Sequence, residues 1–233
     1  MFYSVFDPTM IIVIPGLLAA IYAQLKVQST FARFSAVNAA RGLTGAEAAR
    51  DILHRQGLDH VQVEMIEGRL SDNYDPRDKV LHLSPEVYRG TSLASLGVAA
   101  HETGHAIQHA AGYLPLNIRH SLVPIASVSS TAAFPLFLIG LLLTNPVLMK
   151  TGIYLFSAVL LFQIVTLPVE FNASRRALVL LEGNGYITNR EEVDGVRSVL
   201  SAAALTYVAA ALVSLLNLLR LLLISGLLGR RDD

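Results

Sequence analysis

Three long apolar runs constrain how this chain can fold. They cover residues 122–144, 147–169 and 202–219. Because a helix needs about 20 apolar residues to cross a bilayer, runs of this length predict transmembrane helices. The composition agrees, since 53% of the 233 residues are hydrophobic and 15% are charged. Only Asn145-Pro146 separates the first two runs, so residues 122–169 are predicted to form a transmembrane hairpin.

Both ends of the chain are predicted to add a span. Residues 10–23 are apolar, and residues 2–6 extend that run. A signal peptide typically has Lys or Arg before its apolar run, and here none precedes it. Residues 1–24 are therefore predicted to be a retained anchor. Residues 202–233 are predicted to form a C-terminal helix and tail, either as one span or as a re-entrant hairpin. The expected fold is a predominantly α integral membrane protein with about four transmembrane helices.

The mixed polar stretch 25–121 is predicted to hold most of the soluble fold. Thr44 and Glu47 have capping-box spacing, so a helix is expected from there to Gln56. Residues 61–66 and 79–84 alternate as strands do, with a turn expected at 71–76. This predicts a small sheet. An edge strand can hold an extended peptide by backbone hydrogen bonds, although it can equally serve for packing alone.

The chemistry centres on the sequence H-E-x-x-H at residues 101–105. Residues four apart share one face of a helix, so His101 and His105 can reach one zinc ion while Glu102 acts as general base on a water. A packed apolar side is also present, since the four residues Leu96, Ala100, Thr103 and Ile107 form one stripe opposite the histidines. Net charge is zero, which argues against a nucleic-acid partner, and the absence of cysteine excludes thiolate ligands.

A catalytic zinc site needs a third protein ligand. His109 is about 12 Å along the helix from His101, too far to share an ion. No Asp or Glu occurs between Thr103 and Val169, and the first to follow is Glu170. Glu170 is therefore the candidate ligand, although pairing with Arg175 or Arg176 would also account for it. The fallback ligands are Glu182, Glu191 and Glu192.

The basic residues predict the orientation of the chain. Because 122–169 is a hairpin, residues 25–121 and 170–201 lie on one side of the membrane, together with most Lys and Arg side chains. The positive-inside rule then places both segments, and the H-E-x-x-H helix with them, in the cytoplasm. The basic pair Arg230-Arg231 in the C-terminal tail is an exception if 202–219 crosses once.

Four segments carry a family resemblance: Asn73–Pro76, Leu83–Tyr88, Val98–Gln108 and Leu167–Leu178. Together they resemble the YugP-type bacterial membrane zinc metallopeptidases over nearly the whole chain. The resemblance implies a zincin-like α+β catalytic region of the gluzincin type in a bacterial inner membrane, with one Zn²⁺ held by His101, His105 and Glu170. It also implies a distant likeness to the HtpX-type and CAAX-prenyl membrane peptidases. Three positions depart from these patterns: Asn73 for a frequent His, Asn172 for a common Asp, and Ser174 for the Asp of HtpX-like enzymes.

The expected function is a membrane-embedded metalloendopeptidase that hydrolyses peptide bonds at the cytoplasmic face. Its partners would be polypeptide substrates, membrane proteins included, and the lipid bilayer. Glu102 is the expected base, and residues 170–201 are expected to be a helical segment that carries the third ligand. Four side chains are candidate donors to the oxyanion: His109, His120, Arg176 and Tyr74. Asn172 is a further residue expected near the site.

Two other classes of protein remain open from the sequence. A site-2-like intramembrane protease also uses H-E-x-x-H, but its helix lies within a long apolar span, whereas the run before His101 is short and mixed. A membrane scaffold that binds metal without catalysis is the second. Glu102 argues against it, because structural zinc sites are normally closed by four ligands.

Overall fold

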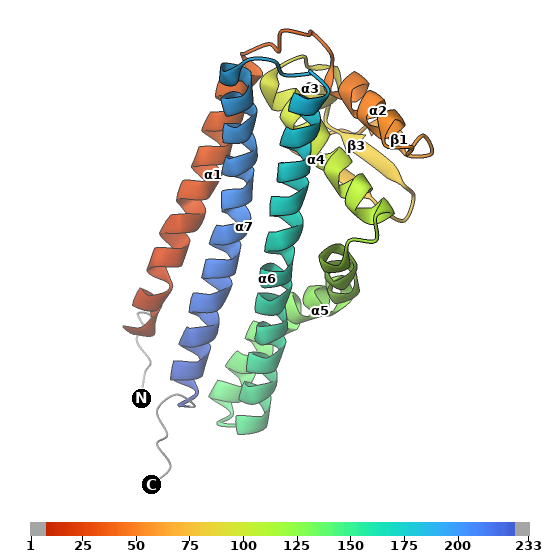
Figure 1. The fold of residues 1–233 in the computed structure, drawn as a ribbon. Helices are drawn as coiled ribbons and strands as arrows, with labels where there is room; N and C mark the ends of the chain where they lie inside the picture. The colour runs from red at the N-terminus through yellow and green to blue at the C-terminus, as the bar shows by residue number, and fades with distance from the viewer. Residues whose placement is uncertain (1–7, 227–233) are drawn as a thin grey trace. The chain divides into compact units, whose positions relative to one another are not determined.

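The computed structural model describes residues 8–226, which form two compact units. Of the described residues, unit 1 contains residues 8–23, 118–167 and 206–226, and unit 2 contains residues 24–117 and 168–205. Helices α1 (Ile14–Ser35), α5 (Leu114–Leu142), α6 (Pro146–Gly183) and α7 (Arg190–Ile224) each contribute residues to both units (Figure 1). Residues 1–7 of the predicted anchor and residues 227–233 of the predicted C-terminal tail lie outside the described part of the chain.

Three described helices are long and apolar enough to cross a membrane, namely α5, α6 and α7. They contain the three predicted apolar runs. Two of them extend well beyond those runs, because α5 begins at Leu114 and α6 continues to Gly183. Helix α7 is unbroken from Arg190 to Ile224, so the described residues agree with one span and not with the alternative of a re-entrant hairpin.

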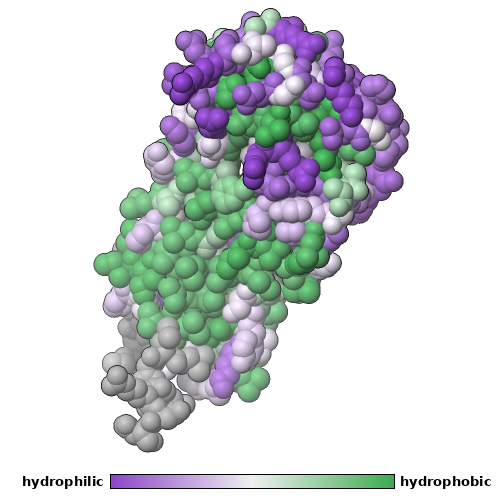
Figure 2. Space-filling model, viewed as in Figure 1, coloured by the Kyte–Doolittle hydropathy of each residue, from purple (hydrophilic) through white to green (hydrophobic). Residues whose placement is uncertain are grey.

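Unit 1 is built on close helix contacts, and apolar residues dominate its visible surface (Figure 2). A Cβ on Gly152 of α6 would lie 2.7 Å from the carbonyl oxygen of Ala133 in α5. A Cβ on Gly16 of α1 would lie 3.2 Å from the Cα of Val213 in α7. Small residues let backbones approach in this way where helices pack in lipid. The 3₁₀ helix η1 (Pro8–Ile12) precedes α1, and Arg220 of α7 donates to Thr9 at 3.2 Å.

Unit 2 holds the remaining elements around helix α4 (Leu93–Ala110). Helix α2 (Gly45–Arg55) begins at the predicted capping box: the Glu47 amide donates to the Thr44 hydroxyl at 3.2 Å, and the Thr44 amide donates to the Glu47 carboxylate at 2.8 Å. The apolar face of this helix is buried, with Ile52 fully inaccessible. A short helix α3 (Pro85–Arg89) leads from the sheet to α4. Hydrophilic residues cover much of the visible surface of this unit (Figure 2).

The sheet has three strands in the order β1-β3-β2. Strands β1 (Gln62–Met65) and β3 (Val80–Leu83) confirm the two predicted strands and pair in parallel. The predicted turn at 71–76 is wrong, because Asn73–Asp75 form β2, antiparallel to β3. Turn-forming residues adopt a strand here since pairing with β3 outweighs their local preference.

The outer edge of β1 is in contact with a side chain. Ladder bonds run from Gln62 N to Lys79 O and from Ile66 N to Leu83 O, so the polar groups of Val63 point away from β3. The guanidinium of Arg50 donates to that Val63 carbonyl at 3.0 Å and to the Tyr88 hydroxyl at 2.6 Å. The outer edge of β1 is therefore occupied by a side chain from α2.

Candidate metal centre

Helix α4 presents the H-E-x-x-H residues because its other side is packed into the core of unit 2. Its first turn is capped by Ser92, whose hydroxyl accepts from the Ser95 amide at 3.1 Å. The predicted apolar stripe is buried, with Leu96, Ala100 and Thr103 fully inaccessible. His101 and Glu102 are partly exposed on the opposite side, and His105 is buried there. Apolar contacts on one side therefore hold the helix in place, and the other side presents the polar residues of the candidate site.

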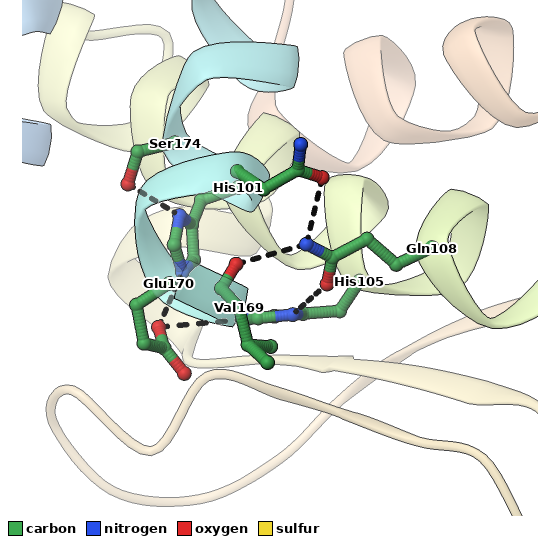
Figure 3. A network of polar contacts seen from close by, with 7 residues as sticks. His101, His105, Gln108, Val169, Glu170 and Ser174 are labelled. Carbon is green, nitrogen blue, oxygen red and sulfur yellow. Dashed lines mark hydrogen bonds and ion pairs between the residues drawn. The ribbon is translucent and has the colours of Figure 1, made fainter. Parts of the chain in front are cut away.

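Glu170 meets both histidines of this helix. Its Oε2 lies 3.2 Å from Nε2 of His101 and 3.6 Å from Nε2 of His105 (Figure 3). The carboxylate is buried. Glu170 belongs to α6, which continues without a break through Pro168. Among residues 8–226 these three form the one group of three or more His, Asp or Glu side chains that are close enough to share a metal ion.

The spacing of the three donor atoms fits a zinc ion. Two ligands about 2.1 Å from a tetrahedral zinc lie about 3.4 Å apart, which is between the two measured distances to Glu170. All three donor atoms lie within 4.8 Å of one another. Two imidazoles and one carboxylate are also a donor set that zinc enzymes use. The residues present therefore fit a zinc ion without rearrangement of the backbone.

A gap-free contact between two helices sets this spacing. A Cβ on Gly104 would lie 2.9 Å from the carbonyl oxygen of Ala173 and 3.3 Å from its Cα. Helices α4 and α6 thus touch backbone to backbone between the two histidines on one side and Glu170 on the other. Any side chain at position 104 would separate the ligands.

Both histidine rings are held by hydrogen bonds at Nδ1, the nitrogen that faces away from Glu170. His101 Nδ1 lies 3.1 Å from the Ser174 hydroxyl, and His105 Nδ1 lies 3.0 Å from Oε1 of Gln108 (Figure 3). Such partners fix the orientation and tautomer of metal-binding histidines. The sequence analysis noted Ser174 only as a departure from the HtpX-like pattern, and it did not identify Gln108 as a site residue.

Carboxylates charge the surroundings of the site. Burial works to lower the pKa of His105, but the bond to Glu170 and the charges of Glu102 and Glu170 raise it above the ordinary value. Asp72 approaches from the segment before β2. Burial raises the pKa of Asp72, the charge of Glu102 raises it further, and hydrogen bonds from Ser84 act in the opposite direction. The charge of Glu102 therefore raises the pKa of both His105 and Asp72.

Four of the five remaining predicted site residues form two pairs, and the fifth is His120. Tyr74 and His109 lie together, with the Tyr74 hydroxyl 2.9 Å from Nδ1 of His109. Burial raises the pKa of the Tyr74 phenol, so this group keeps its proton. Asn172 and Arg176 form the second group, in which Arg176 Nε donates to Asn172 Oδ1 at 2.8 Å. His120 belongs to unit 1.

The fallback ligands lie outside the metal group. Glu192 is buried and accepts hydrogen bonds from the backbone amides of Ala40 and Thr188 at 2.7 and 2.8 Å. It serves to fasten the segment after α1 to the start of α7. Neither Glu182 nor Glu191 belongs to the group of three.

Comparison with known proteins agrees with this site. The profile of the family described as "Putative neutral zinc metallopeptidase" matches residues 9–226. The chain belongs to this family. It is also 51% identical over 212 residues to "Putative membrane protease YugP" of Bacillus subtilis (strain 168), and the alignment covers 91% of this chain and 93% of that protein. The resemblance predicted from the four segments is thereby confirmed.

No solved structure was found to match the chain. The family description and the His101, His105 and Glu170 group together support a zinc-dependent protease. The name of the relative and the three long apolar helices support association with a membrane.

Proposed function

We propose that this chain is a membrane-embedded zinc metalloendopeptidase of the gluzincin type, with one zinc ion per chain and its active site at the cytoplasmic face. The observation that carries the proposal is the convergence of His101, His105 and Glu170 on one point, with Glu102 beside them on α4. A purely structural site would not need a free carboxylate next to a ligand, whereas peptide hydrolysis needs a base there.

The protein groups divide the work of hydrolysis. A zinc ion held by His101, His105 and Glu170 would supply Lewis acidity, which would lower the pKa of a water and polarise a carbonyl. The Glu102 carboxylate takes a proton from the attacking water and delivers it to the leaving nitrogen. The Tyr74 hydroxyl or His109 donates to the oxyanion, since the phenol remains protonated and the two side chains are in contact. His101, His105 and Glu170 only hold the metal.

The substrate is proposed to lie as an extended strand along β2. Of the two outer strands, β1 has its free edge blocked by Arg50, whereas β2 carries Tyr74, which contacts His109 of α4. A peptide that pairs with β2 gains backbone hydrogen bonds of little sequence specificity. The substrate class is therefore unfolded or extended polypeptide, membrane proteins included.

The proposed topology has four spans. Helix α1 is a fourth, because its large apolar side chains Ile14, Leu17 and Leu18 are 48%, 56% and 61% exposed, while Gly16 packs against α7. In this proposal unit 2 lies in the cytoplasm, as the positive-inside rule predicts. The spans lie in a bacterial inner membrane, as the family resemblance implies. Helix α4 is not among the three helices apolar enough to span, which favours a peripheral site over a site-2-like intramembrane one.

The test compares wild type with Glu102→Gln, purified in detergent, for bound zinc and for cleavage of an unfolded protein. Zinc in both and cleavage by wild type alone are expected, because Gln keeps the shape of Glu102 but cannot take a proton. Zinc in both without cleavage by either would favour a metal-binding scaffold. Absence of zinc from wild type would overturn the metal assignment.

A further inference from the structure

Gln108 is fully buried, yet no part of its amide lacks a partner. Its Oε1 lies 3.0 Å from His105 Nδ1, and its Nε2 lies 2.8 Å from the Val169 carbonyl oxygen and 3.0 Å from Asn172 Oδ1. Burying an amide is costly unless it is hydrogen-bonded, so this position is specified by its three partners. One partner is a proposed zinc ligand, and the other two flank Glu170 on α6 (Figure 3).

The orientation of the Gln108 amide follows from its partners. The Val169 carbonyl can only accept, so the amide nitrogen must face it. Asn172 gives the same answer independently. The guanidinium of Arg176 can only donate, so the Asn172 atom it contacts is the oxygen, and that same oxygen faces Gln108. Both contacts require Nε2 of Gln108 on the α6 side and therefore Oε1 on the His105 side.

The orientation of the amide in turn selects one form of His105. An oxygen at Nδ1 accepts a hydrogen bond, so Nδ1 carries the proton of the neutral ring. The lone pair is then on Nε2, the atom that lies 3.6 Å from Glu170. That is the tautomer a metal can bind at this point.

We propose that Gln108 is a positioning residue that fixes the metal-binding tautomer of His105 and ties that histidine to the segment of α6 carrying Glu170. The inference rests on the proposed zinc site and goes beyond it, because it names the side chain that couples two ligands from distant parts of the chain. Gln108 touches neither substrate nor metal. It acts through His105, the backbone of Val169 and the side chain of Asn172.

The test is Gln108→Met, which keeps the volume of the side chain and removes the amide. Zinc affinity, measured by competition with a chelator, is expected to fall about 10- to 100-fold, the usual cost of losing such a partner. The visible spectrum of the Co²⁺-substituted protein is expected to change, because the His105 ring is no longer fixed. A merely structural role would leave the spectrum of the folded protein unaltered.

Thr103→Val is the matched control. Thr103 is on the same helix, fully buried, and donates to the Ala99 carbonyl at 2.8 Å, away from the ligands. It should lose stability without change in zinc affinity or Co²⁺ spectrum. Unchanged affinity and spectrum in folded Gln108→Met would overturn the inference, whereas failure of wild type to bind zinc would overturn the proposed function itself.

A second variant covers the case in which Gln108→Met does not fold. Gln108→Glu keeps an oxygen at His105 Nδ1 but loses the donor to Val169. It should bind zinc more tightly than any folded variant without an acceptor at this position, such as Gln108→Leu, and should be less stable than wild type when metal-free. Equal zinc affinity of Gln108→Glu and Gln108→Leu would contradict tautomer selection.

Discussion

The Ser174 hydroxyl lies 3.1 Å from Nδ1 of His101, one helical turn after Glu170 on α6. Helix α6 therefore supplies one proposed ligand and also holds another in place. The HtpX-like pattern has an aspartate at this position, and the shorter serine still reaches the ring. The hydroxyl can accept from the protonated Nδ1 and leaves Nε2 facing the Glu170 carboxylate.

Ser174→Ala is expected to weaken zinc binding about tenfold, the low end of the range for such partners, because a neutral hydroxyl is a modest acceptor. Chelator competition measures the affinity. Arg175→Ala is the control, since Arg175 is the next residue on the same helix and its side chain is exposed. Equal zinc affinities for the two variants would remove Ser174 from the site.

Gly104→Ala is expected to push α4 and α6 apart. The added methyl would lie 2.9 Å from the Ala173 carbonyl oxygen, which is backbone and cannot rotate away. Overpacking of this kind costs about 1–3 kcal/mol of stability, and it would also separate Glu170 from the histidines. The melting temperature and the zinc affinity of this variant should both be lower than those of wild type.

Gly97→Ala provides the comparison on the same helix. Its Cβ would meet only a methyl of Val196, at 3.3 Å. Zinc affinity should be unchanged in this variant. If Gly104→Ala and Gly97→Ala bound zinc alike, the backbone contact would not be what sets the ligand spacing.

Gly152→Ala tests the packing of unit 1. The new methyl would lie 2.7 Å from the Ala133 carbonyl oxygen and 2.8 Å from the Phe137 Cβ, so the hairpin of α5 and α6 must open. The free energy of unfolding should fall by about 1–3 kcal/mol. The melting temperature in detergent should therefore be lower than that of wild type. Gly183→Ala on the same helix meets nothing within 4 Å and should melt like wild type. A normal melting temperature for Gly152→Ala would refute this packing.

Tyr186 predicts an alkaline limit to stability. Burial and the hydrogen bond it donates to Asp51 raise its pKa to about 12. The ordinary value is about 10, so the folded state holds the phenol proton more tightly than the unfolded state. This contribution is complete below about pH 10 and is lost as the pH rises to about 12. Denaturant unfolding of wild type and Tyr186→Phe across this window should show a steeper loss for wild type, and parallel curves would be contrary to the prediction.

Local signals were sufficient for several elements. Helix α2 could be predicted because Thr44 and Glu47 interact within one turn. The two candidate ligand histidines could be predicted because they are four residues apart on one helix. Glu170 could be proposed as a ligand from the long stretch without acidic residues, and the structure brings it to both histidines. These predictions needed only neighbours in sequence or the absence of competitors.

Other features depend on contacts between distant segments. Strand β2 was missed because Asn73–Asp75 carries turn-forming residues and becomes a strand only by pairing with β3. Gln108 was not identified as a site residue, since its partners Val169 and Asn172 lie about 60 positions away in the chain. The unbroken course of α6 past Pro168 was likewise invisible, because proline usually marks a helix end.

The side chain on the outer edge of β1 also limits what the sheet can propagate. A sheet with two open edges can accept a strand on one side and offer a template on the other, which is how extended chains recruit one another into aggregates. With Arg50 bonded to the Val63 carbonyl, growth in that direction ends at α2. Under the proposed function, one extended segment could pair with β2 while the outer edge of β1 offers no template for a fibril.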